Sequence, residues 1–81
     1  MHMELFEVTF DYFSDGESGN DKFKFTSVQE AQEKFDEYKN VIEQELGQCT
    51  NRDTIEDADT FGIMDVDSGS WAKVYITRKT N

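Results

Sequence analysis

The sequence predicts an α+β fold with the element order β-β-α-β-β, in which one helix packs on one face of a four-stranded, mostly antiparallel sheet. Three observations predict it. Residues 4–13 alternate apolar and polar side chains, residues 28–46 repeat apolar side chains at spacings of three and four, and two further strand-like runs follow from residue 60. A chain of 81 residues suits one domain, which we expect over residues 3–81.

The first two strands are expected over residues 4–13 and 22–26. In the first strand, alternation places four large apolar side chains on one face, namely Phe6, Val8, Phe10 and Tyr12. In the second strand, Phe23 and Phe25 share the inward face. Residues 14–21 between the two strands are rich in turn-forming side chains, which predicts a hairpin with a flexible acidic tip.

The helix is expected over residues 28–46. Ser27 and Glu30 have the spacing of a capping box, in which the Ser27 hydroxyl accepts a hydrogen bond from the Glu30 backbone N–H. The apolar stripe expected to face the sheet consists of Val28, Ala31, Phe35, Tyr38, Ile42 and Leu46. Gly47 follows directly, which predicts that the helix ends on a glycine in the left-handed conformation.

A long connection and a second hairpin are expected in the rest of the chain. Residues 48–59 are polar and acidic and predict a connection without a strand. The third strand is expected over residues 60–66 and the fourth over residues 71–78, joined by a tight turn. In the fourth strand, Ala72, Val74 and Ile76 share one face, while Trp71, Lys73, Tyr75 and Thr77 share the other.

Since one helix covers one face of the sheet, the other face should be open. Four large side chains are expected on that open face, namely Leu5, Phe13, Trp71 and Tyr75. They either lie there singly, as exposed apolar side chains commonly do, or anchor a homodimer or another partner.

Charge is the most informative feature for function. There are 18 acidic residues against 8 basic ones, a formal net charge of −10, which disfavours direct contact with nucleic acid or an anionic membrane and favours a basic partner. The acids gather in three segments, residues 4–21, 30–45 and 53–67. Five of the bases are Lys22, Lys24, Lys73, Arg78 and Lys79.

Catalytic and metal-binding motifs find little support in the sequence. Cys49 is the only cysteine, and the only histidine is His2, so an activated thiol is not expected. Residues 57–62 begin like a calcium loop, but Phe61 and Ser68 stand where oxygen ligands are needed. We therefore expect no enzyme activity, no catalytic residue, no cofactor and no metal site.

Localisation follows from the same composition. One thiol cannot form an internal disulfide, no apolar run approaches the ~18 residues of a membrane span, and no signal-peptide pattern opens the chain. These features predict a cytoplasmic protein. Met1 and His2 are interpreted as a cloning remnant before a native Met3.

Two interpretations of the acidic clusters remain open: they only keep the protein soluble, or they form a binding face. For a binding face, the candidates are helix acids three and four residues apart together with strand and loop acids. They are Glu30, Glu33 and Glu37 on the helix, Glu7 and Asp11 on the first strand, and Asp57 and Asp59 before the third.

In size, acid clustering and layout, the whole chain resembles the small acidic inhibitor proteins of phages and mobile elements. That group includes DNA-mimicking anti-restriction proteins, anti-CRISPR proteins and inhibitors of host nucleoid or polymerase proteins. The resemblance implies an inhibitor that acts in the host cytoplasm and occupies the nucleic-acid-binding surface of a basic host protein. The alternative is a structural or assembly module that dimerises or docks through the open sheet face.

Overall fold

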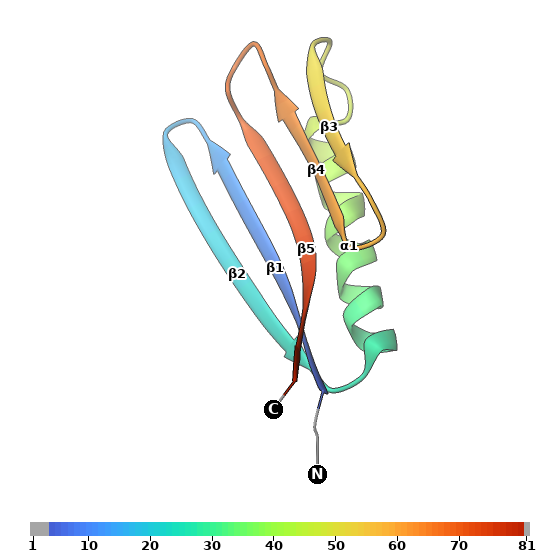
Figure 1. Ribbon diagram of the computed structural model, residues 1–81. Helices are drawn as coiled ribbons and strands as arrows, with labels where there is room; N and C mark the ends of the chain where they lie inside the picture. Colours follow the sequence, from blue (N-terminus) through green and yellow to red (C-terminus); the bar gives the residue numbers. More distant parts are fainter. Residues whose placement is uncertain (1–3, 81) are drawn as a thin grey trace.

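The structure, a computed structural model, describes residues 4–80, so the interpretation of residues 1–2 as a cloning remnant lies outside the described residues. One helix covers one face of an antiparallel sheet, which confirms the α+β prediction (Figure 1). The elements in chain order are β1 (Glu4–Ser14), β2 (Glu17–Phe25), α1 (Val28–Leu46), β3 (Arg52–Glu56), β4 (Thr60–Asp65) and β5 (Trp71–Thr80). No helix among these elements is long and apolar enough to cross a membrane.

The prediction of four strands is wrong, because the sheet has five, in the order β2-β1-β5-β4-β3. The additional strand, β3, lies within the segment predicted to be a connection and pairs with β4 at the edge of the sheet. All five of its residues are exposed. It is therefore held by backbone pairing at an edge, and such a strand needs no apolar alternation that a sequence pattern would reveal.

The connection predicted over residues 14–21 is shorter in the structure, because β2 begins at Glu17 and not at Lys22. Asp15 and Gly16 have positive φ angles of 54° and 81°, as in the two-residue turns that suit hairpins, and β2 begins directly at Glu17. Ser14 pairs with Glu17, and pairing continues to Phe6 with Phe25. The polar side chains of this segment line an edge strand, where they remain in water while the backbone is paired.

The helix has the predicted bounds, and Ser27 caps it by accepting a hydrogen bond from the Glu30 N–H at 3.4 Å. The predicted left-handed cap is wrong, because Gly47 has φ −67° and ψ −18° and continues the right-handed helical bonding to Glu43. The guanidinium of Arg52 donates a hydrogen bond to the Gly47 carbonyl. A side chain from β3 thus satisfies a carbonyl at the helix end, so a left-handed turn is not needed there.

The cap leads to a test of the helix start. Replacing Ser27 by Ala removes the acceptor of the Glu30 N–H and is expected to lower the free energy of unfolding by about 1 kcal/mol. Urea denaturation followed by circular dichroism measures this change. Ser27→Asn, which keeps a capping oxygen, should recover most of the loss; equal losses in both variants would contradict the capping role.

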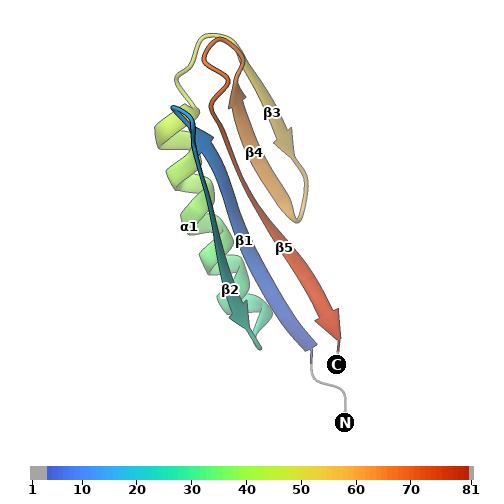
Figure 2. The same cartoon turned by 90° about the vertical axis from the view of Figure 1, so that its left-hand side faces the viewer.

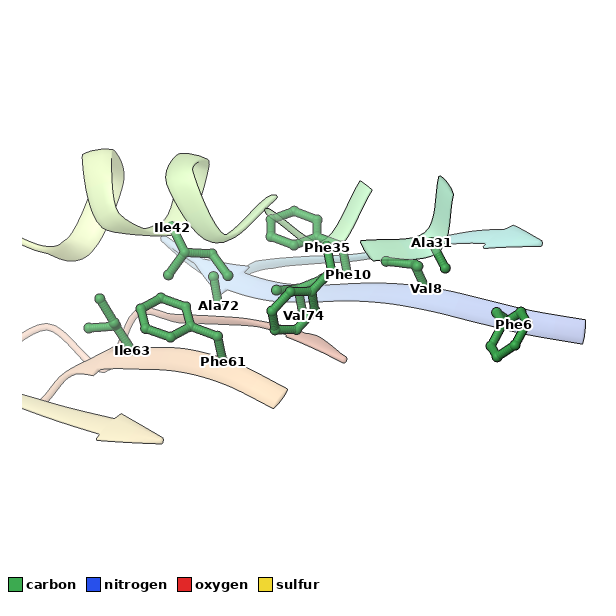
Figure 3. Close-up of a cluster of buried hydrophobic side chains, with 10 residues drawn as sticks. All are labelled: Phe6, Val8, Phe10, Ala31, Phe35, Ile42, Phe61, Ile63, Ala72 and Val74. Atoms are coloured by element: carbon green, nitrogen blue, oxygen red, sulfur yellow. The ribbon is translucent and has the colours of Figure 1, made fainter. Parts of the chain in front are cut away.

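The core lies between α1 and the sheet, where side chains of β1, β4 and β5 meet Ala31, Phe35 and Ile42 of α1 (Figure 3). Val8, Val74 and Ile42 have no exposed surface, which marks the centre of this layer. The buried apolar side chains are Phe6, Val8, Phe10, Ala31, Phe35, Ile42, Phe61, Ile63, Ala72 and Val74. Figure 2 shows α1 on one side of the sheet only, so the opposite side is uncovered by any element.

Candidate functional site

We call the uncovered side of the sheet the open face. Successive residues of a strand point to opposite faces and paired residues share a face, so the register assigns its members. It carries four lysines and three acids, which are Lys22, Lys24, Lys73 and Lys79 against Glu7, Asp11 and Asp53. Its uncharged large side chains are Leu5, Phe13, Ile55, Met64, Trp71 and Tyr75.

The other candidate region is the acidic surface, which we define as the carboxylates of α1 and of the β3–β4 turn region with the two helix lysines. Its nine acids are Glu30, Glu33, Asp36, Glu37, Glu43, Glu45, Glu56, Asp57 and Asp59, and all nine are exposed. Lys34 and Lys39 are its only bases. Nine acids against two lysines leave a local charge of −7, which is most of the net charge of the chain.

The helix and β3 parts of the acidic surface meet at Lys39. Its Nζ lies 3.0 Å from a carboxylate oxygen of Glu56. This hydrogen bond raises the pKa of Lys39 above its ordinary value, and the charges of Glu43 and Asp36 act in the same direction. Carboxylates from two helix turns and from the edge strand are therefore close enough to act on one ammonium group.

Most carboxylates of the acidic surface have no basic partner within the described residues. Besides Glu56, only Glu37 is in an ion pair, with Lys34 at 2.9 Å, and that hydrogen bond raises the pKa of Lys34. The other seven acids lie in no ion pair formed by residues 4–80. The negative charge on this side is thus gathered and largely uncompensated.

Five of the seven acids proposed from the sequence belong to α1 and to the β3–β4 turn, and the other two lie on β1. Glu30, Glu33, Glu37, Asp57 and Asp59 lie on the acidic surface, whereas Glu7 and Asp11 point from β1 to the open face. Glu7 is only 6% exposed and lies 3.5 Å from Lys79, and Asp11 accepts a hydrogen bond from the Asn20 side-chain amide. Alternation along β1 sends these two carboxylates away from α1.

All four proposed anchors, Leu5, Phe13, Trp71 and Tyr75, point to the open face and are partly buried there. Phe13 pairs with Trp71, and Trp71 pairs with Met64. Two further large side chains on this face, Met64 and Ile55, were not among the predicted anchors and are 41% and 60% exposed. Alternation from Gly62 to Met64 was the available signal for Met64, whereas Ile55 was hidden by the unpredicted strand β3.

A groove of about 530 Å³ lies on the open face between β3 and β5. Its floor is at Gly62, where a Cβ would lie 2.9 Å from the Cβ of Lys73, so a side chain there would fill the groove. Ile55, Met64 and Trp71 form its walls. The ammonium group of Lys73 lies 5.8 Å from the centre of the Trp71 ring and 5.6 Å from that of Tyr75.

A second groove, of about 410 Å³, lies inside the acidic surface between α1 and β3. Phe61 and Ile63 form its apolar part, Glu43 and Glu56 supply carboxylates, and Arg52 adds a guanidinium that donates a hydrogen bond to the Gly47 carbonyl. The ammonium group of Lys39 lies 5.1 Å from the centre of the Phe61 ring while it pairs with Glu56. This corner of the protein therefore already binds one cation between a ring and a carboxylate.

Chemistry other than binding has few candidates among residues 4–80. No group of three His, Cys, Asp or Glu side chains in that range is arranged to hold a metal ion. Asp57 instead accepts a hydrogen bond from the Asp59 N–H at 2.9 Å, which shapes the β3–β4 turn. Cys49 is partly buried, and its thiol donates a hydrogen bond to the Leu46 carbonyl at 2.9 Å.

The molecule is thus electrically two-sided, with an acidic surface on the helix side and a charge-balanced, partly apolar open face on the other. Comparison of the chain with protein-family models, curated proteins and solved structures found no match.

Proposed function

We propose that this chain is a non-enzymatic binding protein whose acidic surface occupies the basic, nucleic-acid-binding surface of another protein. The main support for the proposal is that α1 and the adjoining β3–β4 turn carry nine exposed carboxylates and only two lysines, Lys34 and Lys39. Such an excess repels itself and lowers the stability of the fold, so it is retained at a cost. A partner rich in lysine and arginine would relieve that repulsion on binding.

The spacing of the helix acids supports mimicry of a phosphate row. Glu30, Glu33 and Glu37 are separated along the axis of α1 by ~4.5 and ~6 Å, at a rise of ~1.5 Å per residue. One DNA strand carries a phosphate for each ~3.4 Å of axis. The carboxylates are therefore sparser than phosphates, but their row is long enough to pair with several basic side chains that normally grip a backbone.

The groove inside the acidic surface supplies a place for one such side chain. The small exposed parts of Phe61 and Ile63 can contact the aliphatic stem of an arginine or lysine, and Glu43 and Glu56 can bind its charged group, while Arg52 is held at the Gly47 carbonyl. Lys39 makes this kind of contact within the chain itself, because its ammonium group lies against the Phe61 ring and pairs with the Glu56 carboxylate. We infer that a partner cation enters beside Lys39 and anchors the complex.

The first test is capture of partners from a bacterial lysate at 50 mM salt, followed by competition with a duplex DNA. Proteins held through a nucleic-acid-binding surface should be released by the duplex, because both ligands need the same basic groups. Captured proteins that have no affinity for nucleic acid, or that the duplex leaves in place, would refute the mimicry.

A charge-neutralised variant locates the binding surface. The triple change Glu30→Gln, Glu33→Gln and Glu37→Gln keeps the side-chain shapes and removes three charges from the acidic surface. It is expected to weaken the captured complex at least tenfold, since each interfacial charge pair contributes about 1 kcal/mol or more. Isothermal titration calorimetry with the purified partner measures this loss.

The matched control neutralises three exposed acids that lie outside the acidic surface, with the changes Glu4→Gln, Asp15→Asn and Glu17→Gln. It alters the net charge equally and should leave most of the affinity. If both triple variants bind equally, net charge and not the acidic surface governs binding. Thermal unfolding of both variants checks the fold: the helix variant loses the Lys34–Glu37 pair but also the Glu33–Glu37 repulsion, each worth a few tenths of a kcal/mol.

A further inference from the structure

The open face differs from the rest of the surface in charge. Four lysines against three acids give it +1, whereas the acidic surface carries −7. The remaining charges, six acids and two arginines, sum to −4, and they are Glu4, Asp15, Glu17, Asp21, Asp65, Asp67, Arg52 and Arg78. Among contacts between identical surfaces of two copies, the contact between two open faces therefore has the smallest net repulsion. We propose that the open face is the contact surface of a symmetric homodimer.

Apolar side chains on the open face provide the attraction that such a contact needs. Phe13, Trp71 and Met64 form one continuous row across β1, β5 and β4. Ile55 stands beside this row, across the groove floored by Gly62. Tryptophan is among the residue types that contribute most to protein contacts, and a row of large side chains on an uncovered sheet is a typical interaction surface.

The charges of the face are arranged in columns that complement a second copy. Lysines stand on β2, acids on β1 and lysines again on β5. Within one chain, Glu7 is paired in register with Lys24, and Asp11 with Lys73. Glu7 lies 3.5 Å from the ammonium group of Lys79, and Asp11 accepts a hydrogen bond from Asn20, so both carboxylates already have a partner when the face is covered.

A two-fold axis parallel to the strands and midway between β1 and β5 would match these columns. It places β1 of one copy over β5 of the other and keeps residues of one row at the same level. Asp11 then lies over Lys73 of the second copy, and Phe13 lies over Trp71 of the second copy. Each of these contacts occurs twice in the dimer, because the two-fold axis relates the two copies.

The size of the face agrees with a stable but modest dimer. Four overlapping strands at ~4.8 Å spacing, eight residues long at ~3.4 Å per residue, outline roughly 500 Å². Because side chains protrude from the sheet, the accessible surface area of the face is larger than the area of this flat outline. It approaches the ~600 Å² per partner at the lower end of specific interfaces. Sheets also pack face to face with strands within about 30° of each other, which the axis permits. The two acidic surfaces would then point outward.

The first experiment is sedimentation equilibrium of the whole chain from about 5 µM to 1 mM at 150 mM salt. A mass that approaches twice the 9.4 kDa of one chain supports the dimer. A mass of one chain at the highest concentration overturns it, and so does a mass that rises without limit, because a filament does not have a closed two-fold contact.

The second experiment uses charge reversal to test the matching of β1 over β5. The Asp11→Lys variant places a lysine opposite Lys73 of the other copy, and the Lys73→Asp variant places an acid opposite Asp11 of the other copy. Each variant alone should dimerise at least tenfold more weakly than the wild-type chain, because like charges would meet twice. Mixed in equal amounts, the two variants should form a dimer, because every facing pair is then of opposite charge.

The mixing experiment distinguishes a change at the dimer contact from a change in the fold of each chain. Residues 11 and 73 of one chain carry the same charge as each other in either variant, before and after mixing, so only the contact between the two chains changes. The control is Asp67→Lys, which reverses an exposed charge in the β4–β5 turn and should dimerise as the wild-type chain does. Circular dichroism confirms that the variants are folded. Folded single variants that dimerise normally, or a mixture that stays monomeric, would refute the proposed contact. Neither outcome bears on the acidic surface, which lies on the other side of the sheet.

Discussion

Replacing Phe35 by Ala is expected to remove about 3–5 kcal/mol from the free energy of unfolding. Phe35 is 4% exposed and belongs to the cluster that joins α1 to Phe10 and Val74 in the sheet. A domain of this size has a total stability of roughly 4–12 kcal/mol, so the loss amounts to about a quarter of it or more. Among residues 4–80, α1 is the only element that covers the apolar side of the sheet, so no second layer in that range can close the cavity.

Urea denaturation monitored by circular dichroism and tryptophan fluorescence measures this effect. The control is Val28→Ala on the same helix, where the side chain is 56% exposed and the expected change is within about 0.5 kcal/mol. A decrease of less than about 1 kcal/mol in the free energy of unfolding for Phe35→Ala would contradict the packing of Phe35 in the core between α1 and the sheet.

Raising the salt concentration from 50 to 500 mM is expected to weaken binding of the proposed basic partner by about tenfold or more. The Debye length is ~10 Å at 0.1 M and ~3 Å at 1 M, so added salt screens the exposed carboxylates of the acidic surface from an approaching partner. Association should slow more than dissociation accelerates, because the gathered charge acts mainly on the encounter. Stopped-flow or surface plasmon resonance measurements at several salt concentrations separate the two rates.

The charge-neutralised helix variant gives this prediction its control. At 50 mM salt it should bind more weakly than the wild-type chain, and at 500 mM the two should converge, because screening has already removed the contribution of the three charges. A complex whose affinity is constant across this range would contradict a role for the acidic surface. It would instead favour an apolar contact.

The two proposals divide the molecule between its faces. The acidic surface is proposed to bind a basic partner, and that binding should weaken as the salt concentration rises. The open face is proposed to bind a second copy through apolar side chains and matched charges. A dimer through the open face would display two acidic surfaces pointing in opposite directions. Two linked surfaces can bind a partner with two basic sites more tightly than one surface does.

The sequence alone was enough to determine the helix and the strands that contribute to the core. A repeat of three and four residues from Ala31 to Leu46, and alternation through Phe6 to Phe10, reflect side chains that are buried or half-buried, and burial constrains residue type. Val28, the first residue of the predicted stripe, is instead 56% exposed. The acid excess of the helix was likewise visible, because an exposed helix side shows its charges in its own sequence.

Only the tertiary structure decided the fifth strand, the narrow first turn and the partition of charge between faces. β3 is held at an edge by backbone pairing to β4, and backbone pairing selects no residue type. Glu7 and Asp11 belonged to an acidic segment of the sequence, yet pairing of β1 with lysine-bearing β2 and β5 places them on the charge-balanced face. Which charges become neighbours depends on strand order, and strand order is a property of long-range contacts that no local pattern encodes.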